Sequence, residues 1–469
     1  MIVLLSIGEA LIAQARDEKL VGGGTVTVLP EGLDVEVMKT GGLGGLFFSI
    51  HNARFVYLQL LASPRLADRV SAVAPQIDGK LLYLRTMNGT ERPVRASGEI
   101  PSAMAAVGAA SPLAAGEWTD DDGDRRWARP TAVELRHSID HFHVPASTLP
   151  DRESWGEWHY FNIVSADRRR WAFVSLIVAG DVTGSRWGGQ SLVTVHEEGR
   201  APRRFTAVAD ADDVRFSLDR VDLRIGDDSV ALDSSGSYLV RVTAREEGGR
   251  GDPLVLDLRV TPTPRAYFPG STIESGDFTS GYTVPGLRAD GSGSLCIAGR
   301  CEQFDNAQSY HDHNWGVWQG VSWEWGTARL GEYAVLFGRV QPPDSLGGDA
   351  PLFVYLVDSL GFLAVFRPRA IQYVDDRPLA IGGTTIRVPS RGVMSEIRGA
   401  DTLRLELFVE DAVGTDTRAR AAERGESANA PRALRRPYFI QMKGRARVSG
   451  RVGGVRISGD GTGFFETYR

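Results

Sequence analysis

The densest group of chemically capable side chains in the sequence is the segment Ser309–Gly316, which reads Ser-Tyr-His-Asp-His-Asn-Trp-Gly. If this segment is a β-strand, its side chains alternate between two faces. One face then carries Tyr310, Asp312 and Asn314, and the other carries His311, His313 and Trp315. A phenol can donate a hydrogen bond to a carboxyl group or accept one from it. Tyr310 and Asp312 are therefore a candidate acid–base pair.

The two histidines of this segment can converge on one proton or one metal ion, because they share a face of the predicted strand. A second cluster, Glu157–Asn162, shows the same alternation. It places Glu157, His159 and Phe161 opposite Trp158, Tyr160 and Asn162. A third cluster, His137–His143, holds three more of the eight histidines of the chain.

The elements that must position these clusters are predicted to be strands. Leu254–Thr261 and Leu403–Glu410 alternate between apolar and polar residues, as strands of an antiparallel sheet with one buried face do. Similar segments recur along the chain at 25–29, 55–61, 80–85, 158–164, 171–178, 238–244, 334–340, 352–357 and 438–443. Asp-Gly pairs at 122–123, 290–291 and 460–461 predict turns between strands. The fold class is therefore all-β, built from barrels or sandwiches.

Other segments are predicted to lie outside the strands. Residues 97–124, rich in Ala, Gly, Ser and Asp, are interpreted as a linker after an N-terminal β-module. The Ala- and Arg-rich segment Arg418–Glu426 is the one plausible helix and is interpreted as a surface insertion. Met1–Ala15 is compatible both with a signal peptide and with a helical N-terminus.

Composition limits the class of partner. The formal net charge of −6 argues against a nucleic-acid partner, since phosphate binding needs a basic surface. Cys296 and Cys301 flank an Ala-Gly centre, which predicts a tight hairpin with the two cysteines facing each other. A disulfide and two free thiols both remain open, and a disulfide would favour a periplasmic or secreted location over a cytoplasmic one. All ten tryptophans lie between Trp118 and Trp325, where an aromatic-lined cavity is expected.

These clusters resemble the carotenoid 1,2-hydratase family, also called hydroxyneurosporene synthase-like or AttH-like proteins. The Tyr310–Gly316 segment matches the family's Tyr-His-Asp-His-Asn/Gln-Trp-Gly motif in full. Glu157–Phe161 is similar to its Glu-Trp-Trp-Tyr-Phe strand, with His159 where the family usually has tryptophan. Gly281–Gly286 and the ending Gly461–Arg469 also resemble the family. The resemblance covers residues 131–469, and residues 21–130 have no counterpart in it.

The resemblance implies two lipocalin-like antiparallel β-barrel domains packed together, plus an N-terminal β-module. We accordingly expect a possible signal peptide at 1–20, the β-module and linker at 21–130, a first lipocalin-like domain at 131–316 and a second at 317–469. It also implies a cofactor-independent enzyme that adds water to an isoprenoid or polyene double bond, or isomerises or cyclises such a substrate. Asp312 and Tyr310 are the implied catalytic residues.

The expected site contains further residues. His311 and His313 are candidate catalytic partners of Asp312 and Tyr310. The candidate substrate-binding residues are Glu157, Trp158, Tyr160, Tyr282, Asn314, Trp315, Trp323 and Trp325. No metal or organic cofactor is implied. The expected partner is a hydrophobic small molecule, while peripheral contact with a membrane and the oligomeric state are left open.

Alkene hydration begins with proton transfer to carbon, so the acid must hold its proton. A solvated aspartate is ionised at neutral pH, and burial in an apolar barrel raises its pKa. A hydrogen bond from Tyr310 would orient Asp312 but would lower that pKa again. Aromatic ring faces can stabilise the resulting carbocation by about 2 kcal/mol. Trp158, Tyr160, Trp315, Trp323 and Trp325 are the candidates.

Two alternatives remain at this point. A non-catalytic lipocalin-like protein that binds an apolar ligand would use the same aromatic residues, with Asp312 and the histidines in structural roles. A metal enzyme would use the two histidine pairs spaced by one residue, His141 with His143 and His311 with His313. An alternative role for Glu157 is a salt bridge with an arginine across the barrel.

Overall fold

The computed structural model describes residues 70–85, 91–107 and 140–469, together with residues 57, 60, 61 and 136. Within the last range, it leaves out 248–250, 276–277, 319, 344–351, 360, 375, 382, 399, 417–437, 453 and 469. The predicted signal peptide, the strand at 25–29, the Asp122-Gly123 turn, the helix Arg418–Glu426 and the residue His137 lie outside the described residues.

The chain divides into two compact units, residues 1–131 and 132–469. The described part of the first unit is a hairpin of β1 (Gln76–Arg85) and β2 (Glu91–Glu99), followed by helix α4 (Pro101–Ala106). Interpreting residues 97–124 wholly as linker was wrong, because this helix lies within them. Pro101 occupies its first turn, where proline needs no N–H partner, and alanines continue it. No helix among the described residues is long and apolar enough to cross a membrane.

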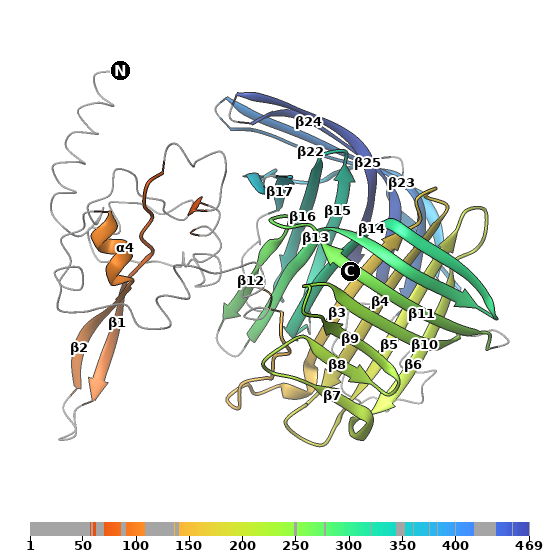
Figure 1. Cartoon of the computed structure of the whole chain (residues 1–469), viewed down its shortest axis with the longest axis horizontal. Coiled ribbons are helices and arrows are strands. Elements are labelled where there is room, and N and C mark those ends of the chain that lie inside the picture. The colour runs from red at the N-terminus through yellow and green to blue at the C-terminus, as the bar shows by residue number, and fades with distance from the viewer. Residues whose placement is uncertain are drawn as a thin grey trace. The chain divides into compact units, whose positions relative to one another are not determined.

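The first large sheet of the second unit closes into a barrel (Figure 1). Its wall follows the order β11-β13-β14-β3-β4-β5-β6-β10, and β10 pairs with β11 to complete the ring. The wall strands are β3 (Trp155–Val164), β4 (Arg170–Gly180), β5 (Trp187–Glu197), β6 (Arg203–Asp210), β10 (Tyr238–Glu246), β11 (Pro253–Pro262), β13 (Phe278–Ile297) and β14 (Arg300–Val317). β7 (Val214–Phe216), β8 (Asp222–Ile225), β9 (Asp228–Leu232) and β12 (Phe268–Ser275) extend it, and η2 (Arg152–Ser154) and η3 (Ala211–Asp213) are single 3₁₀ turns.

The second large sheet is a half-barrel with the order β18-β17-β16-β15-β25-β24-β23-β22-β19. Its strands are β15 (Ser322–Leu330), β16 (Tyr333–Gln341), β17 (Phe353–Asp358), β18 (Gly361–Phe366), β19 (Gln372–Val374), β22 (Arg391–Arg398), β23 (Asp401–Asp416), β24 (Tyr438–Val452) and β25 (Val455–Tyr468). β20 (Arg377–Ile381) and β21 (Thr384–Val388) form a separate hairpin. The predicted all-β class of antiparallel, lipocalin-like sheets is confirmed.

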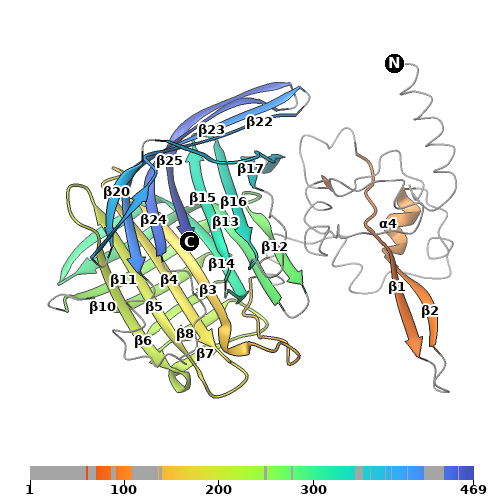
Figure 2. The ribbon, with the colours of Figure 1, turned by 180° about the vertical axis from the view of Figure 1, so that it is seen from behind.

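Each large sheet buries one apolar face. On β11, Leu254, Leu256 and Leu258 are buried while the residues between them are exposed, as their alternation predicts. These leucines join the barrel core, whereas Leu403, Leu405 and Leu407 on β23 join a separate core of the half-barrel. Blue strands β24 and β25 run alongside the yellow barrel strands (Figure 2), and hydrogen bonds such as that from Gln441 to Tyr160 connect the two sheets.

Two Asp-Gly pairs do not form the predicted turns. Asp290-Gly291 lies inside β13, at a bulge, and Asp460-Gly461 lies inside β25. At Gly461 a Cβ atom would lie 1.7 Å from the carbonyl oxygen of Arg329, so glycine here permits the close approach of β15. The glycines therefore mark strand irregularity and contact rather than chain reversal.

The Cys296–Cys301 segment forms the predicted hairpin. β13 ends at Ile297 and β14 begins at Arg300, and the linking residues Ala298 and Gly299 both have positive φ, as a type I′ turn requires. The cysteines are direct cross-strand partners and form a disulfide.

Candidate active site

The candidate site is built on two adjacent barrel strands, β14 and β3. They pair antiparallel, so Asp312 lies opposite Tyr160 and His313 lies opposite His159. The alternation of each strand sends His311, His313 and Phe161 into the barrel. It sends Tyr310, Asp312 and Tyr160 to the outer wall, where the half-barrel packs.

On the outer wall, Asp312 is held by its neighbours on β14. The Tyr310 hydroxyl donates to Oδ2 of Asp312 at 2.7 Å, and Nδ2 of Asn314 donates to Oδ1 at 2.7 Å. The Asp312 side chain is buried, and no salt bridge reaches it within the described part of the chain. This arrangement orients the carboxyl group with two fixed donors.

The half-barrel supplies the facing side chains. Nε1 of Trp325 on β15 donates to the Tyr310 hydroxyl at 3.0 Å. Glu466 on β25 accepts a hydrogen bond from Nε1 of Trp323 at 3.2 Å, and its other oxygen has no hydrogen-bond partner among the described residues. Phe464 packs edge-on against Tyr310, with the ring centroids 5.0 Å apart. A hydrogen-bonded chain therefore runs from Trp325 through Tyr310 to Asp312.

Where the barrel and the half-barrel pack together, the surroundings favour the protonated forms of Asp312, Glu466 and Tyr310. Burial raises the pKa of Asp312 to about 6, although hydrogen bonds from Tyr310 and Asn314 oppose the rise. Burial and the nearby Asp312 raise the pKa of Glu466 well above its usual range. Burial and Asp312 likewise raise the pKa of the Tyr310 hydroxyl. Around neutral pH, Asp312 can therefore both hold and release a proton.

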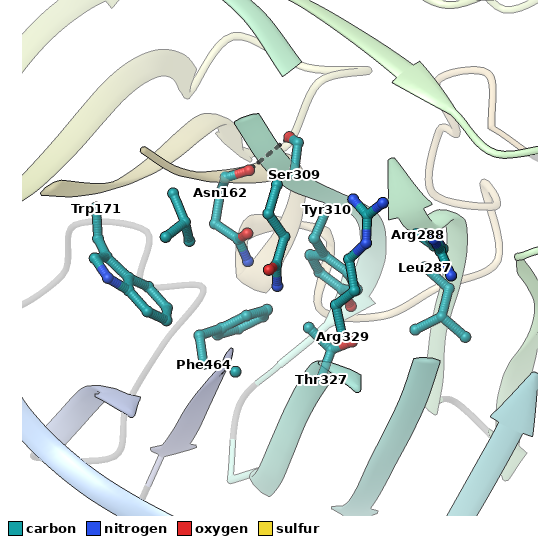
Figure 3. A pocket seen from close by; sticks show the side chains of 12 residues that line it. Asn162, Trp171, Leu287, Arg288, Ser309, Tyr310, Thr327, Arg329 and Phe464 are labelled. Carbon is teal, nitrogen blue, oxygen red and sulfur yellow. Dashed lines mark hydrogen bonds between the residues drawn. The ribbon is translucent and has the colours of Figure 1, made fainter. Parts of the chain in front are cut away.

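A small hollow lies beside the pair (Figure 3). Tyr310, Phe464 and Trp171 contribute aromatic side chains to its lining. The others are Asn162, Val164, Leu287, Arg288, Gln308, Ser309, Thr327, Arg329 and Gly463. Its cavity volume is about 10 Å³, which is room for roughly one water molecule.

The expectation that Asp312 lies inside an apolar barrel was wrong. From Gln308 onward, the even-numbered residues of β14 face outward, so burial of Asp312 comes from packing between the two sheets. Asp312 does not line the hollow, whereas Tyr310 does. The group that can reach a molecule in the hollow is therefore Tyr310.

The other face of β14 enters the barrel and meets a buried polar cluster. Nε2 of His313 donates to Glu157 at 2.8 Å, and its Nδ1 lies 3.1 Å from Oδ1 of Asp140. Burial alone would lower the pKa of His313, but the contacts with Asp140 and Glu157 raise it to about 9. The backbone N–H of His143 also donates to both carboxylate oxygens of Glu157, so among the described residues Glu157 pairs with histidines rather than with an arginine.

The remaining predicted residues divide between the two faces. Trp315 enters the barrel side and stacks on His143, with centroids 3.9 Å apart. Trp158 and Trp323 lie in an aromatic group with Trp318 on the outer side. Tyr282 packs edge-on against Trp325 at 5.0 Å, which places it next to the Tyr310 pair. The predicted set is thus two groups on opposite sides of β14 rather than one pocket.

Sequence reasoning missed two central carboxylates. Glu466 belongs to the family-like C-terminal segment but was given no role. Asp140 lies in the histidine cluster 137–143 and was also given none. In both cases the available signal was an acidic residue within a segment already singled out.

Comparisons with known proteins identify similar structures but no family. No protein-family model matches the sequence, and no curated protein matches it. An AttH-type protein of Nitrosomonas europaea matches with a TM-score of 0.45 and 15% identity, over 70% of this chain and 98% of that one. Kievitone hydratase from Nectria haematococca matches with a TM-score of 0.40 and 14% identity, over 70% of this chain and 96% of that one. CghA with Sch210972 matches with a TM-score of 0.41 and 11% identity, over 70% of this chain and 94% of that one.

Proposed function

We propose that this protein is an acid–base enzyme that protonates a carbon–carbon double bond of an apolar substrate. Asp312 is the proton source in this proposal, and Tyr310 passes the proton into the hollow. The observation that carries the proposal is the buried Tyr310–Asp312 hydrogen bond in aromatic surroundings, with the pKa of Asp312 raised to about 6. A carboxyl group in this state is suited to proton transfer near neutral pH.

The proposed steps balance protons without any further reactant. When Asp312 is neutral, its carboxyl group donates to the Tyr310 oxygen and the Tyr310 hydroxyl proton turns toward the hollow. Tyr310 gives that proton to one alkene carbon and takes the proton of Asp312, which becomes a carboxylate and accepts from the Tyr310 hydroxyl as it does in the structure. Water then adds to the carbocation and returns a proton through Tyr310 to Asp312. The net result is addition of water, while loss of a proton from carbon instead would give an isomer or a cyclised product.

Aromatic side chains support the cationic intermediate in this proposal. Tyr310, Phe464 and Trp171 surround the hollow, and ring faces attract a cation by about 2 kcal/mol when both are desolvated. The hollow is far smaller than the roughly 300–1,000 Å³ of a typical ligand pocket. Substrate binding therefore requires the contact between β14 and β25 to open.

The Tyr310–Gly316 segment is the reason to propose an isoprenoid or polyene substrate, since it resembles the carotenoid 1,2-hydratase motif. We propose hydration first, with isomerisation or cyclisation as the other outcomes of the same protonation.

The test uses purified protein, acyclic isoprenoids with a terminal double bond, and oxygen-labelled water. We expect a product heavier by one labelled water molecule, or an isomer of unchanged mass. The variant Asp312→Asn should lose turnover by about 100-fold or more, as general acids contribute 10²–10⁴-fold. Asp228→Asn is the matched control, because Asp228 is also buried with its pKa raised by burial but lies outside the site.

Full turnover by Asp312→Asn would remove Asp312 from the mechanism. Retention of an unchanged substrate by both variants and the wild type would instead identify an apolar-ligand binding protein.

A further inference from the structure

Four polar side chains converge inside the barrel, behind the strand that carries Tyr310 and Asp312. Asp140, His159, His311 and His313 are each 0–1% exposed. They come from three segments: the approach to β3, β3 itself and β14. None has a role in the proton transfer proposed above.

Several of their polar atoms have no hydrogen-bond partner among the described residues. These atoms are Oδ1 of Asp140, Nδ1 of His159 and Nδ1 of His313. They face one another, since Oδ1 of Asp140 lies 3.1 Å from Nδ1 of His313 and 3.9 Å from Nδ1 of His159. A proton on Nδ1 of His313 would pair that nitrogen with Asp140, whereas Nδ1 of His159 has no partner at hydrogen-bond distance among the described residues. Leaving such a buried polar atom unpaired costs about 1–3 kcal/mol.

A hydrogen bond to the backbone fixes which ring nitrogen of His311 carries a proton. Its Nδ1 lies 3.0 Å from the carbonyl oxygen of Tyr160 and must donate to it, because a carbonyl can only accept. In the neutral ring, Nε2 then has a lone pair, and it faces Oδ2 of Asp140 at 3.3 Å. Two lone pairs repel unless a positive charge lies between or beside them.

We propose that Asp140, His159, His311 and His313 bind one divalent transition-metal ion of the zinc type. Three imidazole nitrogens and one carboxylate oxygen are ligands that zinc accepts. Ligand atoms about 2.0–2.1 Å from a tetrahedral ion lie about 3.4 Å from one another. Oδ1 of Asp140 lies 3.1 Å from Nδ1 of His313 and 3.9 Å from Nδ1 of His159, and Oδ2 lies 3.3 Å from Nε2 of His311. The distances from the two carboxylate oxygens therefore bracket that value.

The surrounding groups also fit a metal site. Metal-binding histidines usually donate their second ring N–H to a carboxylate or a backbone carbonyl. His311 does so to Tyr160, and His313 does so to Glu157 at 2.8 Å. The Tyr238 hydroxyl donates to Oδ2 of Asp140 at 2.6 Å and so orients the carboxylate.

The ion would act as a structural clip. It joins the segment that precedes β3 to β3 and β14, and it fixes β14 from the side opposite Tyr310 and Asp312. This role departs from the expectation that the protein needs no metal, and it does not depend on the proposed proton transfer.

The first experiment measures metal content. Full-length protein is stripped with a chelator, incubated with Zn²⁺, freed of unbound metal by gel filtration and measured by elemental analysis. We expect one ion per chain and a higher melting temperature. His159→Gln and Asp140→Asn should abolish both effects. His141→Gln, a neighbouring histidine outside the set, should keep them.

Cobalt supplies the second readout if those variants do not fold. Co²⁺ bound to the wild-type protein should give the intense visible absorption of a tetrahedral ion, displaced by one equivalent of Zn²⁺. Clearly substoichiometric zinc with no change in melting temperature, or a Co²⁺ spectrum of octahedral type, would overturn the proposal.

Discussion

At the scale of single residues, Asp312 links stability to pH. Its folded-state pKa of about 6 exceeds the ordinary value of 3.8, so the fold favours the neutral acid. This contribution is complete below about pH 4 and is lost as the pH rises through 6, which costs about 3 kcal/mol by pH 8. Asp312→Asn cannot ionise and does not lose this stability. The unfolding free energy of the variant minus that of the wild type should therefore be about 3 kcal/mol larger at pH 8 than at pH 4. Urea unfolding at the two pH values measures this, and an equal difference at both would contradict it.

Tyr310 tunes the acidity of Asp312. The hydrogen bond from its hydroxyl lowers the pKa of Asp312, so Tyr310→Phe should raise that pKa above 6. The variant also leaves Nε1 of Trp325 without its acceptor, which should cost about 1–3 kcal/mol of unfolding free energy. Carboxyl infrared bands followed against pH report the shift. Tyr333→Phe, at a partly buried residue that packs against the core of the half-barrel, should leave the pKa of Asp312 unchanged.

At the scale of elements, alternation predicted strands well where one face is buried. Leu254–Thr261 lies in β11 and Leu403–Glu410 lies in β23. The prediction succeeds because the alternation requires only that every second side chain is buried in a core. The Asp-Gly pairs misled because glycine serves close strand contacts as well as turns. Their role depends on a neighbouring strand that is distant in sequence, as β15 is from Gly461.

Gly461 should be intolerant of any side chain. A Cβ atom there would lie 1.7 Å from the carbonyl oxygen of Arg329, a backbone atom that cannot rotate away. We expect Gly461→Ala to lower the unfolding free energy by about 1–3 kcal/mol, since overpacking forces the backbone to shift. Gly199→Ala is the comparison: nothing lies within 4 Å of that position, but its φ of 74° adds strain of about 1 kcal/mol. Chemical denaturation of both variants measures the two losses of unfolding free energy. A smaller loss for Gly461→Ala than for Gly199→Ala would contradict the steric account.

The Cys296–Cys301 disulfide closes a short hairpin. Its contribution should be small, about 2 kcal/mol, because a short loop loses little chain entropy when closed. Unfolding of the wild type and of a Cys296→Ala/Cys301→Ala double variant in denaturant measures the difference. Equal stability would show that the β13–β14 pairing alone orders the hairpin.

At the scale of the whole molecule, the candidate site depends on contacts that no local pattern contains. Alternation correctly separated Tyr310 and Asp312 from His311 and His313, because it follows from backbone geometry. It could not show which face enters the barrel, since both faces of β14 are buried. Glu466 is more than 150 residues away from Asp312 in sequence, and only the packing of β25 on the barrel brings them together.

Because the barrel and the half-barrel share this buried contact, residues 132–469 should fold without the first unit. Both sheets and every residue of the candidate site belong to this unit. Bonds such as that between His196 on β5 and Asp411 on β23, at 2.9 Å, connect the sheets. We expect a fragment of residues 132–469 to unfold in one transition, with tryptophan fluorescence and far-ultraviolet circular dichroism changing together. It should also keep the pKa of Asp312 near 6, because the groups that set that pKa all lie within the fragment. Two separate transitions would show that the sheets are independently stable, and a normal aspartate pKa in the fragment would show that the first unit is needed to bury the site.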